Sequence, residues 1–170
     1  ITGASATGTR VRANYIGTTA NGSAALGNGG QGVYVQAPSN TIGGTGEARN
    51  VISGNTGAGV RVQGPDAHDN VLFGNYIGCD ATGNAAGIPN VYGVFVLNAS
   101  LNTIGGSGAD EGNVISGNAA GGVRIEQTDG TSTGNVLLGN TIGLSADGAA
   151  FLGNDGAGVF IQEATTSTVG

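Results

Sequence analysis

The hexapeptide Asn-Val-Ile-Ser-Gly-Asn occurs twice in this chain of 170 residues, first at Asn50 and again 63 residues later at Asn113. Other segments return at nearly the same interval: Asn14-Tyr-Ile-Gly recurs at Asn75 and, with Thr in place of Tyr, at Asn140. A constant interval between similar segments indicates a repeat architecture, in which each unit buries its apolar side chains against the next. We therefore predict that the whole chain, residues 1–170, is one stacked domain.

Each 63-residue period contains two simpler units, and each unit carries three short apolar segments separated by Gly and Asn. The first segment of every unit begins with Gly-Val, followed by one variable residue and another Val or Ile. Three short strands per unit match one coil of a solenoid, because stacking brings equivalent side chains of successive coils to about 4.8 Å. The sequence predicts an all-β parallel solenoid of about five coils with three parallel sheets. The five Gly-Val segments begin at Val33, Val60, Val94, Val123 and Val159.

Strand alternation places Val33 and Val35 inside the solenoid and Tyr34 outside. The equivalent outward residues of the five units alternate between aromatic and arginine side chains on adjacent coils. Each guanidinium is then close enough to a ring for a contact of about 0.5–1 kcal/mol. Such a stripe either stiffens the outer sheet or forms a recognition surface, since rings and Arg concentrate at binding hot spots and flat rings suit sugar faces. Its residues are Tyr34, Arg61, Phe95, Arg124 and Phe160.

Asparagines form two columns at the predicted corners of the coils. Asn tolerates the left-handed backbone of a tight corner, and its amide can bond to the same amide one coil above and below. One column stands before the third strand, and the other stands four residues ahead of the Gly that opens the first strand. The first column is Asn14, Asn50, Asn75, Asn113 and Asn140, and the second is Asn28, Asn55, Asn118 and Asn154.

The two-coil period also appears in the lengths of the inserts. One coil carries an insert between its second and third strands, and the next coil carries one after its third strand. The inserts of the first kind are residues 45–49 and 107–112, and those of the second kind are 18–27, 79–89 and 144–153.

Composition excludes several classes of protein. The chain has no Lys, and five Arg stand against eleven Asp and Glu, for a net charge of −6. The basic patch that drives nucleic-acid binding is therefore missing. No apolar run approaches the roughly 20 residues that cross a bilayer, so membrane insertion is not expected. The chain starts at Ile1, lacks Met and has no leading signal segment, which favours a processed product or an excerpt.

No metal or cofactor is expected. Residues 27–32 fit the G-x-G-x-x-G pattern, but they lead into a strand and not into a helix that could hold a phosphate. Residues 105–110 resemble one calcium-binding nonapeptide, yet the sister loop at Gly43 has Glu47 and Arg49 in place of a second copy. Cys79 is the only cysteine, which excludes an internal disulfide and a paired-cysteine metal site.

Taken together, the motifs IGT, GN, GV, NTIGG and NVISGN resemble the right-handed parallel β-helix repeats of the pectin-lyase-like superfamily. The resemblance covers the entire chain and is closest to repeats of long secreted or surface proteins of bacteria. It implies an extracellular or cell-surface location. Because enzymes, adhesins and structural proteins all carry such repeats, it leaves the function open.

A catalytic interpretation would use acids in the turn after the first strand. Asp66 and His68 lie in that turn of one coil, and Asp129 lies in the same turn two coils later. Carboxylates two coils apart would be about 9–10 Å from each other, near the separation used by inverting glycosidases. Lyases with this fold instead use calcium-binding acids with a Lys or Arg base, and this chain has no Lys.

The preferred interpretation is a non-catalytic structural or adhesive β-helix of a cell surface or filament. The chain itself is the expected partner, through end-to-end or lateral association, because no amphipathic segment covers the terminal coils. A polysaccharide-cleaving enzyme and a carbohydrate-binding module are the alternatives, and both would make a polysaccharide the partner.

Overall fold

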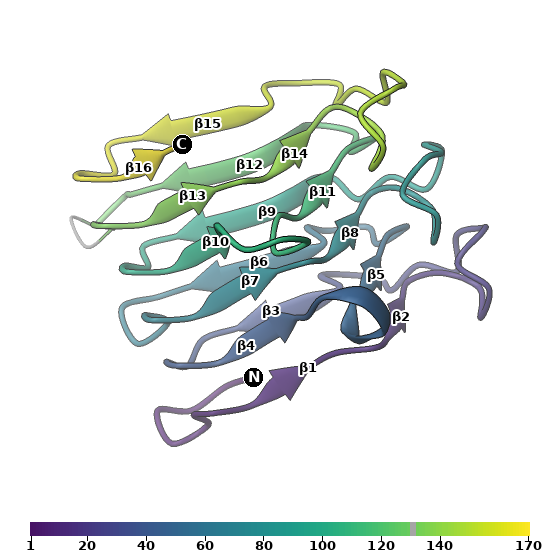
Figure 1. Ribbon diagram of the computed structural model, residues 1–170. Coiled ribbons are helices and arrows are strands. Elements are labelled where there is room, and N and C mark those ends of the chain that lie inside the picture. Colours follow the sequence, from purple (N-terminus) through teal and green to yellow (C-terminus); the bar gives the residue numbers. More distant parts are fainter. Residues whose placement is uncertain (130–131) are drawn as a thin grey trace.

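The computed structural model describes residues 1–129 and 132–170, and these residues form a stack of coils built from three parallel sheets (Figure 1). Each coil contributes one strand to each sheet, so consecutive strands in the chain lie in different sheets. Sheet I contains β3 (Val33–Val35), β6 (Val60–Gln63), β9 (Tyr92–Leu97), β12 (Gly121–Glu126) and β15 (Val159–Gln162).

Sheet II contains β1 (Arg10–Val11), β4 (Thr41–Gly43), β7 (Val71–Phe73), β10 (Thr103–Gly105), β13 (Val136–Leu138) and β16 (Thr168–Val169). Sheet III contains β2 (Tyr15–Ile16), β5 (Val51–Ile52), β8 (Tyr76–Ile77), β11 (Val114–Ile115) and β14 (Thr141–Ile142). The only helical turn in the described part of the chain is η1 (Gly46–Ala48), within the first insert. The predicted all-β parallel solenoid of about five coils is confirmed.

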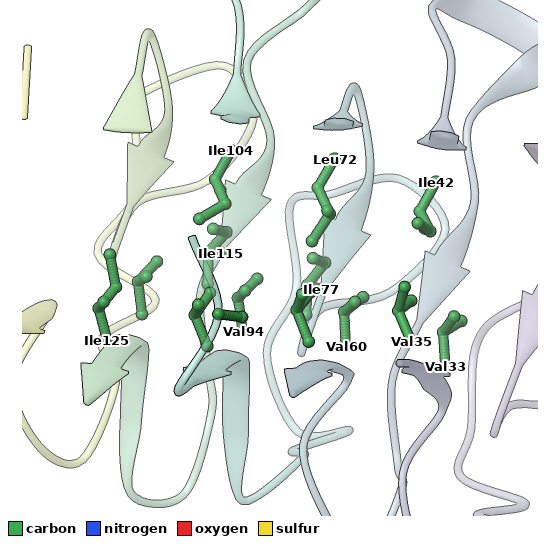
Figure 2. Packing of buried hydrophobic residues seen from close by; sticks show 14 of the residues in the cluster. Val33, Val35, Ile42, Val60, Leu72, Ile77, Val94, Ile104, Ile115 and Ile125 are labelled. Atoms are coloured by element: carbon green, nitrogen blue, oxygen red, sulfur yellow. The ribbon is translucent and has the colours of Figure 1, made fainter. Parts of the chain in front are cut away.

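The core consists of columns of Val, Ile and Leu that run along the axis of the stack. Figure 2 shows Ile42, Leu72 and Ile104 of sheet II above Ile77 and Ile115 of sheet III, and all five are fully buried. Strand pairing places equivalent residues beside each other, so each apolar side chain packs on its counterpart in the next coil. Each buried aliphatic side chain contributes about 1.5–3 kcal/mol, which makes these columns the main source of stability.

The predicted column of Asn14, Asn50, Asn75, Asn113 and Asn140 is a continuous hydrogen-bonded ladder. The Nδ2 of each of the first four donates to Oδ1 of the asparagine in the next coil over 2.9–3.2 Å. Because the same Nδ2 atoms also donate to main-chain carbonyls, as Asn75 does to Ile42 O at 2.9 Å, the amides satisfy the corner backbone. The ladder predicted from the repeat is confirmed.

The second predicted column has a member that the spacing rule missed. Asn90 is the member of the coil between those of Asn55 and Asn118: it accepts from Asn55 Nδ2 at 2.9 Å and donates to Asn118 Oδ1 at 3.1 Å. Asn90 stands three residues ahead of Gly93, whereas the other members stand four residues ahead of theirs. The spatial column is continuous although the sequence register shifts by one.

A third ladder, which the sequence reasoning did not identify, precedes sheet II. Asn40 N donates to Asn70 Oδ1 at 2.8 Å, Asn70 Nδ2 donates to Asn102 Oδ1 at 3.0 Å, and Asn102 Nδ2 donates to Asn135 Oδ1 at 3.2 Å. Each of these asparagines directly precedes a strand of sheet II, so an Asn at this position recurs in the sequence and could have predicted the ladder. All three corners are therefore closed by asparagine ladders.

The inserts of the second kind stack on one another although they belong to alternate coils (Figure 1). Ala81 N donates to Gly22 O at 3.1 Å, and Ala146 N donates to Gly83 O at 2.9 Å. Asp80 shapes its insert from within, because its Oδ1 accepts from backbone nitrogens of Thr82, Asn84 and Ala85. These contacts between inserts of alternate coils explain why the sequence repeats every two coils.

The described residues contain no helix with the length and apolar character of a membrane span.

Cys79 is fully buried at the start of one insert, and desolvation raises the pKa of its thiol from 9.0 to about 12. We expect iodoacetamide to leave Cys79 unmodified at pH 8 in the folded protein and to modify it completely in concentrated urea, because the thiolate is the nucleophile. Mass spectrometry of the two reactions checks this, and rapid labelling of the folded chain would contradict it.

The pKa of the Cys79 thiol is higher in the folded than in the unfolded chain, so the thiol's contribution to the free energy of unfolding is lost as the pH rises from 9 to 12.

Candidate recognition surface

The outer face of sheet I carries the aromatic and arginine stripe in the predicted register. Tyr34 pairs with Arg61, Arg61 with Phe95, Phe95 with Arg124, and Arg124 with Phe160. Val35 and Val62 on the same strands are fully buried, whereas four of the stripe residues are half-buried and the fifth, Phe160, is 41% exposed. The alternation of inward Val with outward ring or Arg is therefore as expected.

Both arginines of the stripe lie against rings. The Arg61 guanidinium carbon is 4.9 Å from the Phe95 ring centroid. That of Arg124 is 4.9 Å from the Phe160 centroid and 5.6 Å from the Phe95 centroid. Tyr34 is anchored differently, because its hydroxyl donates to Gln63 Oε1 at 3.0 Å. The stripe is thus a ladder of interleaved cations and rings held by the strand register.

Tyr92 belongs to the same surface, although the sequence reasoning missed it. Its ring packs on Phe95 with centroids 5.6 Å apart, and its hydroxyl accepts from Arg124 Nη1 at 3.4 Å. Simple alternation fails here because Gly93 also faces the interior: a Cβ on it would overlap Ile115 Cγ2. The tight approach of Gly93 and Val94 to the core turns Tyr92 outward.

Two hollows flank Tyr92 along the stripe. One, of about 160 Å³, lies between Arg61, Phe95 and Tyr92, with Ala58 at its margin. The other, of about 110 Å³, lies between Arg124, Phe160 and Tyr92. The lining of each hollow includes small residues of the neighbouring coils, Gly57 and Ala58 in the first hollow and Ala120 and Gly121 in the second. The two arginines are two coils apart, which corresponds to about 9–10 Å.

The two arginines differ in how their charge is balanced. Arg124 Nε donates to Glu126 Oε2 at 2.9 Å, and this hydrogen bond raises the pKa of Arg124. Position 63, which is in register with Glu126 through Leu97, holds Gln and not Glu. Arg61 Nε is buried and has no hydrogen-bond partner in the described structure. Arg61 therefore carries an uncompensated charge, whereas Arg124 is neutralised within its own strand.

The residues of the catalytic alternative lie on exposed turns after sheet I. Asp66 and Asp129 are both exposed, each three residues beyond the registered pair Gln63 and Glu126. His68 Nδ1 lies 2.8 Å from Oδ2 of its neighbour Asp69, so the closest partner of the histidine is on the same turn. The turn after β12 includes positions 130–131, which lie outside the described residues. Among the described residues, no group of three or more His, Cys, Asp or Glu is arranged to hold a metal ion.

A second face with rings, over sheet III, was not anticipated. The Arg49 guanidinium carbon lies 4.0 Å from the Tyr76 ring centroid, and Arg49 Nε donates to Gly74 O at 2.9 Å. Hollows of about 170 and 240 Å³ lie beside Tyr15 and Tyr76. Because Arg49 uses its Nε on the backbone, it is fixed as part of the corner.

Comparisons of the chain with family models, with curated proteins and with solved structures found no match. The fold described above follows from the strand pairing alone. The resemblance to the pectin-lyase-like superfamily stays a prediction from the repeat motifs.

Proposed function

We propose that this chain is a non-catalytic structural and adhesive β-helix of an extracellular or cell-surface protein or filament. In this proposal the repeats are of the pectin-lyase-like kind, and the stack presents its outer face of sheet I to a partner. The partner is a second copy of the chain, joined laterally or end to end, or a polysaccharide.

The observation that carries the proposal is the continuity of the asparagine ladders. At the corner before sheet III, every coil from Asn14 to Asn140 is bonded to the next through side-chain amides. Parallel coils that are joined both by sheets and by corner amides resist separation along the whole stack. Such a rod suits a load-bearing or displaying role, because its surface residues keep a constant spacing.

The stripe is the surface best suited to contact within this role. Rings and guanidinium groups that are held by strand register form a preorganised face, so little side-chain entropy is lost on binding. We expect the triple variant with Tyr34, Phe95 and Phe160 replaced by Ser to lose self-association and glycan binding by at least about tenfold, because the ring contacts are removed together. Analytical ultracentrifugation and a glycan array measure the two losses.

A matched control replaces aromatic residues elsewhere on the surface, Tyr15→Ser with Phe151→Ser, which are 50% and 84% exposed. This control should keep both properties. Circular dichroism must show that each variant retains its β structure. A folded triple variant with unchanged association and unchanged glycan binding would reduce the stripe to a scaffold.

A polysaccharide-cleaving enzyme is the alternative, and the shared turn position of Asp66 and Asp129 favours it over other activities. Reducing-sugar release and unsaturated-product absorbance on acidic and neutral polysaccharides distinguish the two functions. Turnover that disappears in Asp66→Ala and Asp129→Ala would replace the structural proposal with hydrolysis by paired carboxylates. We expect no turnover, and binding without turnover would favour a carbohydrate-binding module.

A further inference from the structure

Arg61 is the unbalanced cation of sheet I. The described residues offer its guanidinium one ring contact, with Phe95, and no hydrogen bond or ion pair. A buried Nε–H without an acceptor is costly, and a guanidinium that meets a carboxylate forms short, charge-assisted hydrogen bonds. The buried Nε–H is out of reach of an outside ligand, but the outer nitrogens of this half-buried side chain meet no carboxylate of the described residues and can receive an anion from outside.

The surroundings of Arg61 suit an anion that is attached to a flat or apolar body. The hollow of about 160 Å³ beside it is lined by the rings of Phe95 and Tyr92 and, from the neighbouring coil, by Gln31 and the small residues Gly57 and Ala58. A carboxylate can lie against the outer nitrogens of the guanidinium while the group that carries it rests on a ring. The space exceeds that of a single water, so it admits more than a small ion.

The equivalent position two coils away shows what a filled site looks like. There Glu126 of the same strand supplies the carboxylate, and Arg124 Nε donates to it at 2.9 Å. At the Arg61 coil this internal carboxylate is replaced by Gln63, whose Oε1 accepts from the Tyr34 hydroxyl at 3.0 Å. One site of the stripe carries its own anion, and the other lacks it.

We propose that the hollow at Arg61 is a binding site for one carboxylate of a partner. The proposal depends on the contact role of the stripe, and it names the chemistry that this surface selects. The occupant is a sugar acid, because the rings of Tyr92 and Phe95 that line the hollow offer flat faces to the sugar while its carboxylate meets Arg61; a carboxylate from a second copy of the chain is the competing outcome of the test. Glu126 fills the corresponding site at Arg124, so of the two arginines of the stripe Arg61 is the one open to an external anion.

The direct test observes the arginine Nε–H signals by NMR, because the chain has only five arginines. Sodium glucuronate is titrated into the protein, and methyl glucoside serves as the uncharged comparison. We expect glucuronate to shift the Arg61 signal and methyl glucoside to leave it in place. Equal shifts with both sugars would overturn the carboxylate assignment.

Two variants exchange the internal carboxylate between the two arginines. Gln63→Glu gives Arg61 a partner on its own strand, so it should weaken glucuronate binding at least about tenfold, as Arg61→Gln should. Glu126→Gln removes the partner of Arg124, so the Arg124 signal should begin to respond to glucuronate. Arg12→Gln, which removes an exposed arginine elsewhere, should leave the Arg61 response unchanged.

Sedimentation of the protein alone separates the two sources of the carboxylate. Self-association that is lost in both Arg61→Gln and Gln63→Glu, without a response to glucuronate, would assign the site to a second copy. If neither glucuronate binding nor self-association depends on Arg61, the inference is wrong. In that case, loss of association in the triple serine variant would still support the contact role of the stripe. Unchanged association in that variant would contradict both proposals.

Discussion

Replacing Gly43 by Ala is expected to prevent this chain from folding, or to lower its free energy of unfolding by more than about 4 kcal/mol. Gly43 ends β4 with a φ of +111°, and a Cβ built on it would overlap the carbonyl oxygen of Phe73 in the next coil and crowd the Asn75 amide. The clash is with backbone, which no side-chain rotation can relieve. Urea denaturation followed by circular dichroism measures the effect.

Gly64→Ala is the matched control for this substitution. Gly64 has a similar φ of +94°, but a Cβ on it would meet nothing within 4 Å. Its replacement should therefore cost only the left-handed backbone strain, about 1–2 kcal/mol. Equal destabilisation by the two substitutions would mean that backbone strain, and not the distance between coils, determines the need for glycine at position 43.

The second large effect is expected for Asn75→Ala, which should lower the free energy of unfolding by about 3 kcal/mol. Asn75 is fully buried at the centre of its ladder; it accepts from Asn50 Nδ2 and donates to Asn113 Oδ1, each at 2.9 Å. Truncation leaves Ile42 O without its amide donor and opens a cavity at the corner. Thermal and urea unfolding of the purified variant give the difference.

Asn14→Ala tests whether the loss arises from burial. Asn14 belongs to the same ladder, but it is exposed and bonds to only one neighbouring asparagine, Asn50. Water can replace its hydrogen bonds, so we expect a loss below about 1 kcal/mol. A comparable loss in both variants would show that the ladder is no stronger in the centre than at its edge.

The repeat in the sequence was sufficient to predict most of the fold. Val and Ile residues at a constant interval can all be buried, and the Asn residues can all be hydrogen-bonded, only when the units stack in register. The same register places the outward residues of the first strands on one face, namely Tyr34, Arg61, Phe95, Arg124 and Phe160. The inward position of Val33 and Val35 followed from alternation, which holds wherever a strand is regular. Local pattern and global fold agree at these positions.

Irregular positions were determined only in three dimensions. Asn90 joins its ladder although it stands one residue closer to its strand than the other members do, and spacing alone cannot show which spatial column such a residue joins. Tyr92 faces outward because Gly93 and Val94 both approach the core, which breaks the alternation that sequence reasoning assumes. Both misses occur where a loop meets a strand, and there the backbone path depends on neighbouring coils.

The candidate site likewise has one part that the sequence predicted and one part that only the tertiary structure decided. The sequence by itself determined that two arginines alternate with three rings on one face, because strand register follows from the repeat. Only the tertiary structure decided that Arg124 is paired with Glu126 while Arg61 has a buried Nε without an acceptor. Register is a property of the backbone and is repeated in every coil. Charge balance depends on which side chains meet in space, and one exchange of Glu for Gln changes it.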